Sequence, residues 1–134
     1  MGKPFIAGNI NYRLGIFGLG VSSDVISIQQ SEDSQKGGNF GLYDQRTALR
    51  WISQNISAFG GDPTRITIAG QSAGAKSVHA HVLEAKFGRR PPLFRKAIQQ
   101  SGAIGSIGPV TLEAQDQKLE QLCRTLGIST HSHS

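Results

Sequence analysis

The sequence predicts an α/β fold, in which a mostly parallel sheet is flanked by helices. Short β-branched runs alternate along the chain with longer segments whose apolar residues recur at three- and four-residue steps. Such alternation implies parallel strands joined by right-handed helical crossovers. A chain of 134 residues, of which 37% are hydrophobic and 17% charged, is large enough to bury the core of one domain. We therefore expect strands and helices in the order β-α-β-α-β-α.

The first half of the chain is expected to contain a strand, a long loop and a helix. Residues 5–12 are predicted to form a strand, and residues 15–38, which are rich in glycine, serine and glutamine, to form a loop. Residues 41–59 are predicted to be helical because their apolar residues form one stripe, which consists of Leu42, Leu49, Ile52, Ile56 and Phe59. Residues 60–63 should end this helix, since glycine adopts left-handed dihedral angles and Pro63 cannot continue a helical ladder.

The second half of the chain repeats the alternation. Residues 66–69 form a β-branched run typical of a buried strand, and residues 73–83 can continue as a helix. After a basic loop, residues 96–100 are predicted to form a short strand, and the leucines of residues 112–126 to lie on a final helix that Gly127 ends. Ligands of a parallel sheet bind beyond the carboxyl ends of the strands, which is where Ser72 would lie.

Gly70, Ser72 and Gly74 form a Gly-x-Ser-x-Gly pentapeptide at the predicted turn from strand to helix. A sharp turn of this kind needs small residues, and we expect side chains at Gly70 and Gly74 to collide with neighbouring backbone. The strained turn would lift the Ser72 hydroxyl clear of the sheet, towards the positive end of the following helix dipole. Ser72 is therefore a candidate nucleophile, although the pentapeptide alone also occurs by chance in polar turns.

A serine nucleophile requires a histidine within hydrogen-bond reach and a carboxylate that orients the histidine. His79 and His81 lie on the helix that leaves the turn, two residues apart and thus on different faces. At a rise of 1.5 Å per residue, even His79 would be about 10 Å from Ser72 along the helix axis. Neither histidine is expected to serve as the base.

The residues around Ser72 extend into a much longer pattern. The stretch FGGDPTRITIAGQSAG at residues 59–74 resembles the serine signature of the type-B carboxylesterases, the family of the cholinesterases and fungal lipases. Further segments match landmarks of this family in the family's order: NYRLGIFG at 11–18, GNFGLYDQ at 38–45, ALRW at 48–51 and QSG at 100–102. The resemblance covers about residues 6–128 and implies an α/β-hydrolase fold that hydrolyses carboxylic esters.

The resemblance also implies roles for individual residues. Ser72 matches the acyl-accepting nucleophile, and the backbone N–H of Ala73 matches a donor of the oxyanion hole. Ser101 matches a serine that forms a hydrogen bond near the acid and the histidine, although a strand-end turn that needs a small residue would explain Ser101 equally well. Gln71 stands where family members commonly have glutamate. The site wall therefore lacks one negative charge, which argues against a preference for cationic esters.

Family members carry the acid and the histidine of the triad beyond the position of Ser134, and the glycine-rich oxyanion loop before the position of Met1. We therefore expect residues 1–134 to be an incomplete type-B carboxylesterase domain that is inactive by itself, and residues 129–134 to be an unstructured tail. The alternatives are a truncated product without function and a non-catalytic, cholinesterase-like interaction domain.

The remaining expectations concern partners. The substrate would be a small-molecule or lipid carboxylic ester, and no cofactor or metal is expected. The net charge of +5 includes a basic cluster around Pro91 and Pro92, which is typical of a solvated loop and lacks the stacking residues of a nucleic-acid site. No apolar run is long enough to span a membrane. The sequence predicts neither the compartment nor the oligomeric state.

Overall fold

The computed structural model of the chain describes residues 2, 4–31, 38–88, 91–103, 105 and 110–129. Contacts divide it into two compact units. The first unit takes its residues from Met1–Tyr12 and Leu42–Gly108, and the second from Arg13–Gly41 and Pro109–Ser134. Each unit is described separately below, because the candidate site lies entirely within the first.

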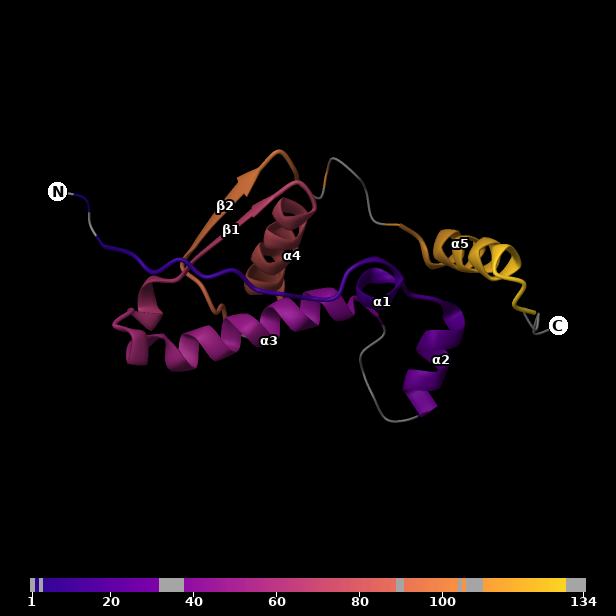
Figure 1. Cartoon of the computed structure of the whole chain (residues 1–134), viewed down its shortest axis with the longest axis horizontal. Coiled ribbons are helices and arrows are strands. Elements are labelled where there is room, and N and C mark those ends of the chain that lie inside the picture. Colours follow the sequence, from indigo (N-terminus) through magenta and orange to yellow (C-terminus); the bar gives the residue numbers. More distant parts are fainter. Residues whose placement is uncertain are drawn as a thin grey trace. The chain divides into compact units, whose positions relative to one another are not determined.

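The first unit is built on a parallel pair of strands, β1 (Thr67–Gln71) and β2 (Lys96–Gln100). Thr67 pairs with Lys96 and Gln71 with Gln100, so both strands end at the same edge of the sheet. The connection between them is α4 (Ala73–Phe87), which packs against both strands (Figure 1). The predicted α/β fold with parallel strands and a helical crossover is confirmed, with β2 at the predicted residues and α4 one turn longer than predicted.

The core of the first unit lies where α3 (Phe40–Asn55), β1 and α4 meet. Leu49 of α3, Ile68 of β1 and Val78 of α4 are buried together, and three partly buried side chains pack against them: Ile66, Leu93 and Phe94. Two short 3-10 helices, η1 (Ile56–Phe59) and η2 (Pro63–Arg65), connect α3 to β1. Gly60 between them has a φ of 80°, so the left-handed turn predicted after the helix is confirmed.

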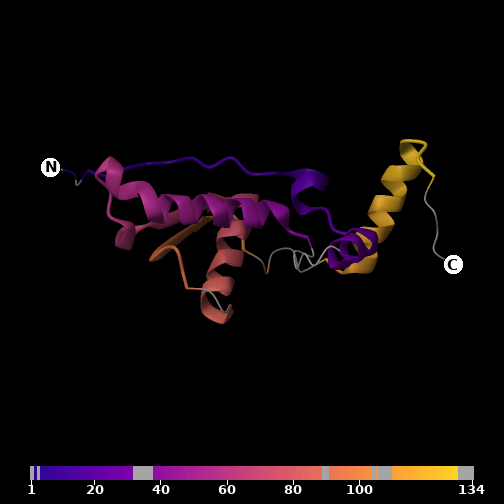
Figure 2. The same ribbon diagram turned by 90° about the horizontal axis from the view of Figure 1, so that it is seen from below.

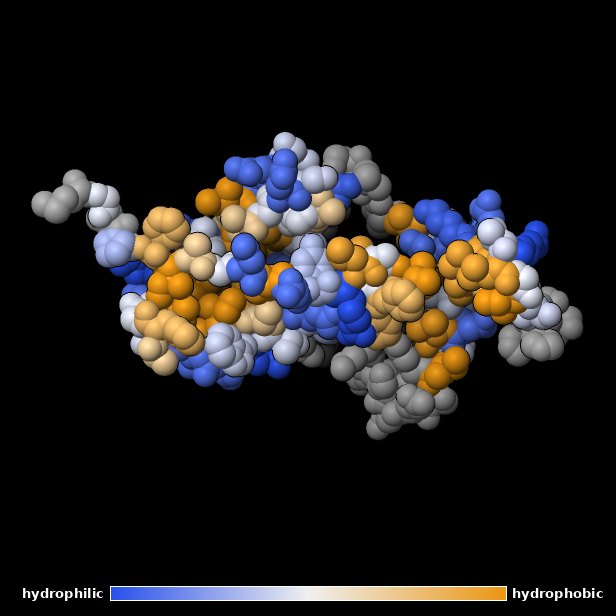
Figure 3. Space-filling view, viewed as in Figure 1, coloured by the Kyte–Doolittle hydropathy of each residue, from blue (hydrophilic) through white to orange (hydrophobic). Residues whose placement is uncertain are grey.

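The strand predicted for residues 5–12 is not present. The described residues 4–12 follow an extended path along α3 but form no strand pairing (Figures 1 and 2). Phe5 is 86% exposed, and apolar side chains are visible on this face of the first unit (Figure 3). The β-branched and aromatic residues favour an extended backbone, but a strand also requires a neighbouring strand for its N–H and C=O groups. No described strand provides that ladder.

The described part of the second unit is mainly helical, which corrects the prediction of a loop for residues 15–31; residues 32–37 of that predicted loop lie outside the described residues. It contains α1 (Gly15–Leu19), α2 (Ser23–Ser31) and α5 (Leu112–Thr125). The Ser22 hydroxyl accepts a hydrogen bond from the Val25 N–H at 3.2 Å, which satisfies a free donor at the start of α2. The predicted final helix is confirmed as α5, and Gly127 follows it with a φ of 67°. Of the tail predicted at residues 129–134, all but residue 129 lie outside the described residues.

Asp116 joins two helices of the second unit. Its carboxylate, on α5, accepts hydrogen bonds from the Ser23 N–H at 2.9 Å and from the Ser23 hydroxyl at 2.5 Å, at the start of α2. These bonds stabilise the charged form and hold the pKa of Asp116 below its usual value of 3.8. The contact therefore weakens when the carboxylate is protonated.

We expect the Ser23 amide to report the protonation of Asp116. In an NMR titration of the chain, the Ser23 amide shift should change with a midpoint below 3.8. The Asp116→Asn variant should lose this titration because it has no ionisable group, whereas Asp62→Asn, in the other unit, should retain it. A Ser23 amide that titrates unchanged in Asp116→Asn would contradict the contact.

Candidate active site

Ser72 lies in the sharp turn between β1 and α4, as predicted. Its backbone has a φ of 52° and a ψ of −114°, a conformation that L-residues rarely adopt and that costs on the order of 1–3 kcal/mol. The Ser72 N–H donates a hydrogen bond to the carbonyl oxygen of Gln100 at 2.9 Å, which fixes the turn to the neighbouring strand β2. The Ser72 side chain is exposed beyond the carboxyl ends of both strands. A strained, accessible serine at this edge has the geometry of a nucleophile elbow.

The two glycines of the pentapeptide differ in their surroundings. A Cβ atom at Gly70 would lie 2.3 Å from the carbonyl carbon and oxygen of Gly74, so only glycine allows the first turn of α4 to approach β1 this closely. The predicted collision at Gly70 is confirmed. The same prediction for Gly74 is wrong, because a Cβ atom there meets no described atom within 4 Å.

Ser101 occupies the equivalent place after β2. Gln71 pairs with Gln100, so the next residue of each strand, Ser72 and Ser101, lies at the same sheet edge. Ser101 also has a positive φ, of 54°, and its side chain is exposed. A Cβ atom at the following residue, Gly102, would lie 2.6 Å from the Ser72 carbonyl oxygen, so the two strand ends are tightly packed. The structure thus brings together the two serines that the sequence predicted for the site.

Ala73, the third predicted site residue, is the first residue of α4 and is exposed. The first four N–H groups of a helix have no carbonyl partner within the helix. The N–H of Ala73 is one of these groups, and the dipole of α4 adds positive potential at the same place. A negatively charged oxygen that developed next to Ser72 would find a donor there.

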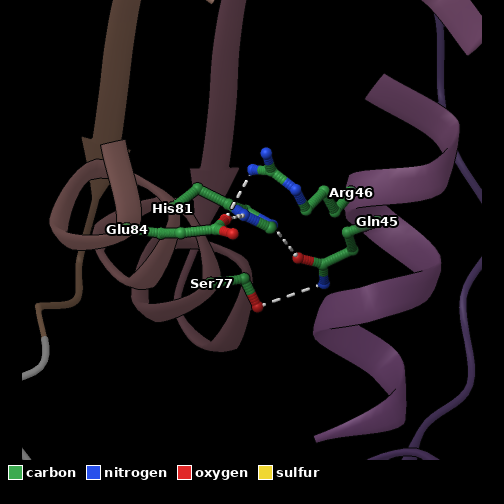
Figure 4. Close-up of polar contacts among 5 residues, drawn as sticks. All are labelled: Gln45, Arg46, Ser77, His81 and Glu84. Atoms are coloured by element: carbon green, nitrogen blue, oxygen red, sulfur yellow. Dashed lines mark hydrogen bonds and ion pairs between the residues drawn. The ribbon is translucent and has the colours of Figure 1, made fainter. Parts of the chain in front are cut away.

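A polar network, buried at Gln45 and His81 and partly buried elsewhere, connects α3 to α4 (Figure 4). The Gln45 amide bridges two residues of α4: its Nε2 group donates to the Ser77 hydroxyl at 3.2 Å, and its Oε1 atom lies 2.9 Å from His81 Nε2. Beside this bridge, Arg46 Nη1 donates to Glu84 Oε2 at 2.7 Å. No sequence pattern predicts this network as a whole. Its one local signal was the position of Gln45, which continues the apolar stripe of α3 between Leu42 and Leu49.

His81 is only 6% exposed and points from α4 towards Gln45 of α3 (Figure 4). Burial lowers the pKa of His81 below 6.5, and the positive charge of Arg46 lowers it further, while the nearby Glu84 carboxylate, 3.7 Å from Nδ1, acts in the opposite direction. The neutral form with a proton on Nε2 donates to Gln45 Oε1. The structure therefore agrees with the expectation that His81 does not act as the base for Ser72.

A cavity of about 220 Å³ lies beside the network, open to solvent on one side. Its lining includes Gly74 from the elbow, Gln45, Ser77 and His81 from the network, and Ile10 from the extended segment.

No group of three or more His, Cys, Asp or Glu side chains that could hold a metal ion occurs among the described residues. None of the helices in the described ranges has the length and apolar character of a membrane-spanning segment.

Comparison with known proteins identifies the family. The model of the carboxylesterase family matches residues 5–134. The chain belongs to the carboxylesterase family. Three curated relatives are Lipase 5 of Diutina rugosa, 40% identical over 99% of the chain, Esterase FE4 of Myzus persicae, 41% identical over 97%, and Acetylcholinesterase of Danio rerio, 48% identical over 95%. The chain spans 24%, 21% and 18% of the lengths of these three proteins.

The first unit of this carboxylesterase-family chain has a parallel strand pair and a helical crossover, which is consistent with a partial α/β fold of that family. Its sequence is similar to those of lipases, esterases and an acetylcholinesterase, so the chain is related to carboxylic ester hydrolases. The parallel strands and the crossover helix are the parts of the α/β fold that surround Ser72.

Gly70 and Gly74 provide a matched pair of substitutions. Gly70→Ala should lower the free energy of unfolding by about 1–3 kcal/mol, because the new Cβ atom would force β1 and α4 apart. Gly74→Ala should raise it by about 0.5–1 kcal/mol, since Gly74 is helical and its Cβ position is open. Urea unfolding of the two variants measures both effects, and equal losses of stability would contradict the close contact at Gly70.

The buried His81 should make the chain less stable in acid. Because its folded pKa is lowered, the unfolded chain binds the proton more readily below pH 6.5. The contribution of neutral His81 to stability is complete above about pH 6.5 and is lost as the pH falls towards the folded pKa. Urea unfolding across this range should show a steeper decline in stability for the wild type than for His81→Asn. Parallel curves for the wild type and His81→Asn would rule out this role.

Proposed function

We propose that the chain carries the nucleophile of a serine carboxylic ester hydrolase and that Ser72 is this nucleophile. The single observation that supports it most is the strained and exposed position of Ser72 between the carboxyl end of β1 and the amino end of α4. A left-handed conformation in a serine is unfavourable, and such strain is kept where it contributes to a mechanism. Membership of the carboxylesterase family supports ester hydrolysis as that mechanism.

In the proposed reaction, Ser72 Oγ attacks the carbonyl carbon of the ester while a histidine takes the hydroxyl proton. The carbonyl oxygen becomes negatively charged and accepts a hydrogen bond from the Ala73 N–H. The tetrahedral intermediate then collapses: the bond to the alcohol breaks, and the alcohol leaves with the proton from the histidine. Water attacks the acyl-Ser72 ester in the same way and releases the carboxylic acid.

We infer that the histidine and its acid do not come from α4. His81 is held in the polar network, and His79 lies two turns along the helix from Ser72. On this proposal, residues 1–134 supply the nucleophile and one oxyanion donor but do not hydrolyse esters by themselves.

Ser101 is proposed as an auxiliary residue of the same site. It lies at the sheet edge beside Ser72, and its exposed hydroxyl is available to a group that approaches Ser72 from that side. Gln71, which precedes the nucleophile, is exposed and uncharged. A neutral wall suits a small-molecule or lipid carboxylic ester without a cationic group, so we propose this class of substrate.

The proposal is tested by labelling with a fluorophosphonate, which reacts with activated serines. The protein expressed from the complete gene that carries this sequence should be labelled and should hydrolyse p-nitrophenyl esters. Ser72→Ala should abolish labelling and lower kcat by on the order of 10⁶-fold, as loss of a catalytic serine does elsewhere. Ser57→Ala, an exposed serine on η1, is the matched control and should retain full activity.

Two results would overturn this function. Labelling that persists in Ser72→Ala would place the nucleophile elsewhere. A folded wild-type protein that is never labelled would instead indicate a non-catalytic domain of this family. Hydrolysis by residues 1–134 alone, at a rate that depends on Ser72, would contradict the proposal that the base lies outside them.

A further inference from the structure

We propose that Gln45 is a positioning residue for the nucleophile elbow and that it acts through Ser77 on the backbone of Ala73. The inference rests on the proposed function of Ser72. The residues concerned belong to the network in Figure 4, and the Ser72 side chain itself is exposed.

The hydrogen bonds of the network form one directed chain. The Ser77 hydroxyl donates its single proton to the Ala73 carbonyl oxygen at 3.2 Å, so towards Gln45 it can only accept. The Gln45 amide nitrogen is the donor that fits, at 3.2 Å, which turns the amide oxygen towards His81. His81 Nε2 then donates to this oxygen at 2.9 Å. Each group has one role, and the chain runs from His81 through Gln45 and Ser77 to Ala73.

The end of this chain is the residue that the reaction uses. Ala73 offers its N–H to the oxyanion, and the same residue presents its carbonyl to Ser77. The backbone at this point must hold Ser72 at a φ of 52°, and a strained residue keeps its conformation only when its surroundings fix it. The network therefore contacts the first turn of α4 directly, through the hydrogen bond to the Ala73 carbonyl.

The Gln45 end of this chain is buried, whereas the bond from Ser77 to the Ala73 carbonyl is exposed. The Gln45 side chain is only 4% exposed, and its amide groups would lose hydrogen-bond partners if α4 moved away from α3. The Arg46 to Glu84 ion pair also joins the two helices, but it lies three turns along α4 from Ala73. The Arg46 to Glu84 ion pair therefore contributes to the general attachment of α4 to α3, whereas the Gln45 bridge also acts on the first turn of α4.

The experiment compares these two contacts in the protein expressed from the complete gene. Gln45→Met keeps the length of the side chain but removes both hydrogen bonds, and Ser77→Ala removes the contact with Ala73. Glu84→Gln is the control, since it weakens the ion pair between α3 and α4 and meets the chain only at His81, 3.7 Å away, leaving the bonds from Gln45 through Ser77 to Ala73 in place. The rate constant of fluorophosphonate labelling and the KM and kcat for a p-nitrophenyl ester are measured well below the melting temperature of every variant.

Gln45→Met and Ser77→Ala should each slow labelling and lower kcat about tenfold, the factor that corresponds to one net hydrogen bond, with KM unchanged. The double variant should be no slower than either single variant, because both act through the same chain. Glu84→Gln should label at the wild-type rate even where its melting temperature falls. Unchanged labelling in Gln45→Met, or an equal loss in Glu84→Gln, would overturn the positioning role.

If the wild-type protein is not labelled, the proposed function of Ser72 is refuted. The connection between Gln45 and the first turn of α4 can still be measured by hydrogen exchange. The Lys76 N–H donates to the Ser72 carbonyl oxygen at 3.2 Å, so its hydrogen exchange reports the order of the first turn. Exchange at Lys76 should accelerate about tenfold in Gln45→Met and remain unchanged in Glu84→Gln. Equal exchange in all three proteins would overturn the connection between Gln45 and the elbow.

Discussion

Ser72 remains in a left-handed conformation because three backbone contacts hold the turn from both sides, and the rest of the first unit is arranged around them. Its N–H is bonded to Gln100 of the neighbouring strand. Gly70 lets the backbone of Gly74 lie against β1, and Gly102 lets the end of β2 lie against the Ser72 carbonyl. None of these contacts depends on the identity of the Ser72 side chain. The backbone thus places an exposed side chain at a fixed point beyond the strand ends.

The junction of α3 and α4 holds few fully buried apolar side chains, and polar groups contribute to it directly. Leu49, Ile68 and Val78 form the apolar centre, while Gln45 and His81 are buried beside them. A buried polar group is unfavourable unless it is hydrogen-bonded, so these residues hold the helices in the one arrangement that satisfies them. Apolar packing would tolerate small shifts of α4 along α3, whereas the bridge from Gln45 to Ser77 and His81 does not. This is why we assign the network a role in positioning the elbow.

Local sequence patterns were sufficient for the strand and helix on either side of Ser72 and insufficient for the segments around them. The strand before Ser72, the helix after it and β2 were predictable because β-branched runs, helical spacing and glycines act over a few residues. The strand at residues 5–12 was wrong because a strand depends on a partner elsewhere in the chain. The helices at residues 15–31 were missed because glycine and serine suggested a loop, although Ser22 caps α2. The polar network joins residues 32 and 36 positions apart, a relation that no local pattern contains.

The same network explains why His81, although it lies on the helix that follows Ser72, is not directed at that serine. A general base needs a free nitrogen lone pair within about 3 Å of the serine hydroxyl. In His81 the Nε2 atom carries the proton that Gln45 accepts, and Nδ1 faces Glu84, so both ring nitrogens are directed into the junction between the helices. A histidine that instead turned towards Ser72 would leave the Gln45 amide oxygen without its partner inside the core. The helix that follows Ser72 is therefore attached to α3 through its own histidine.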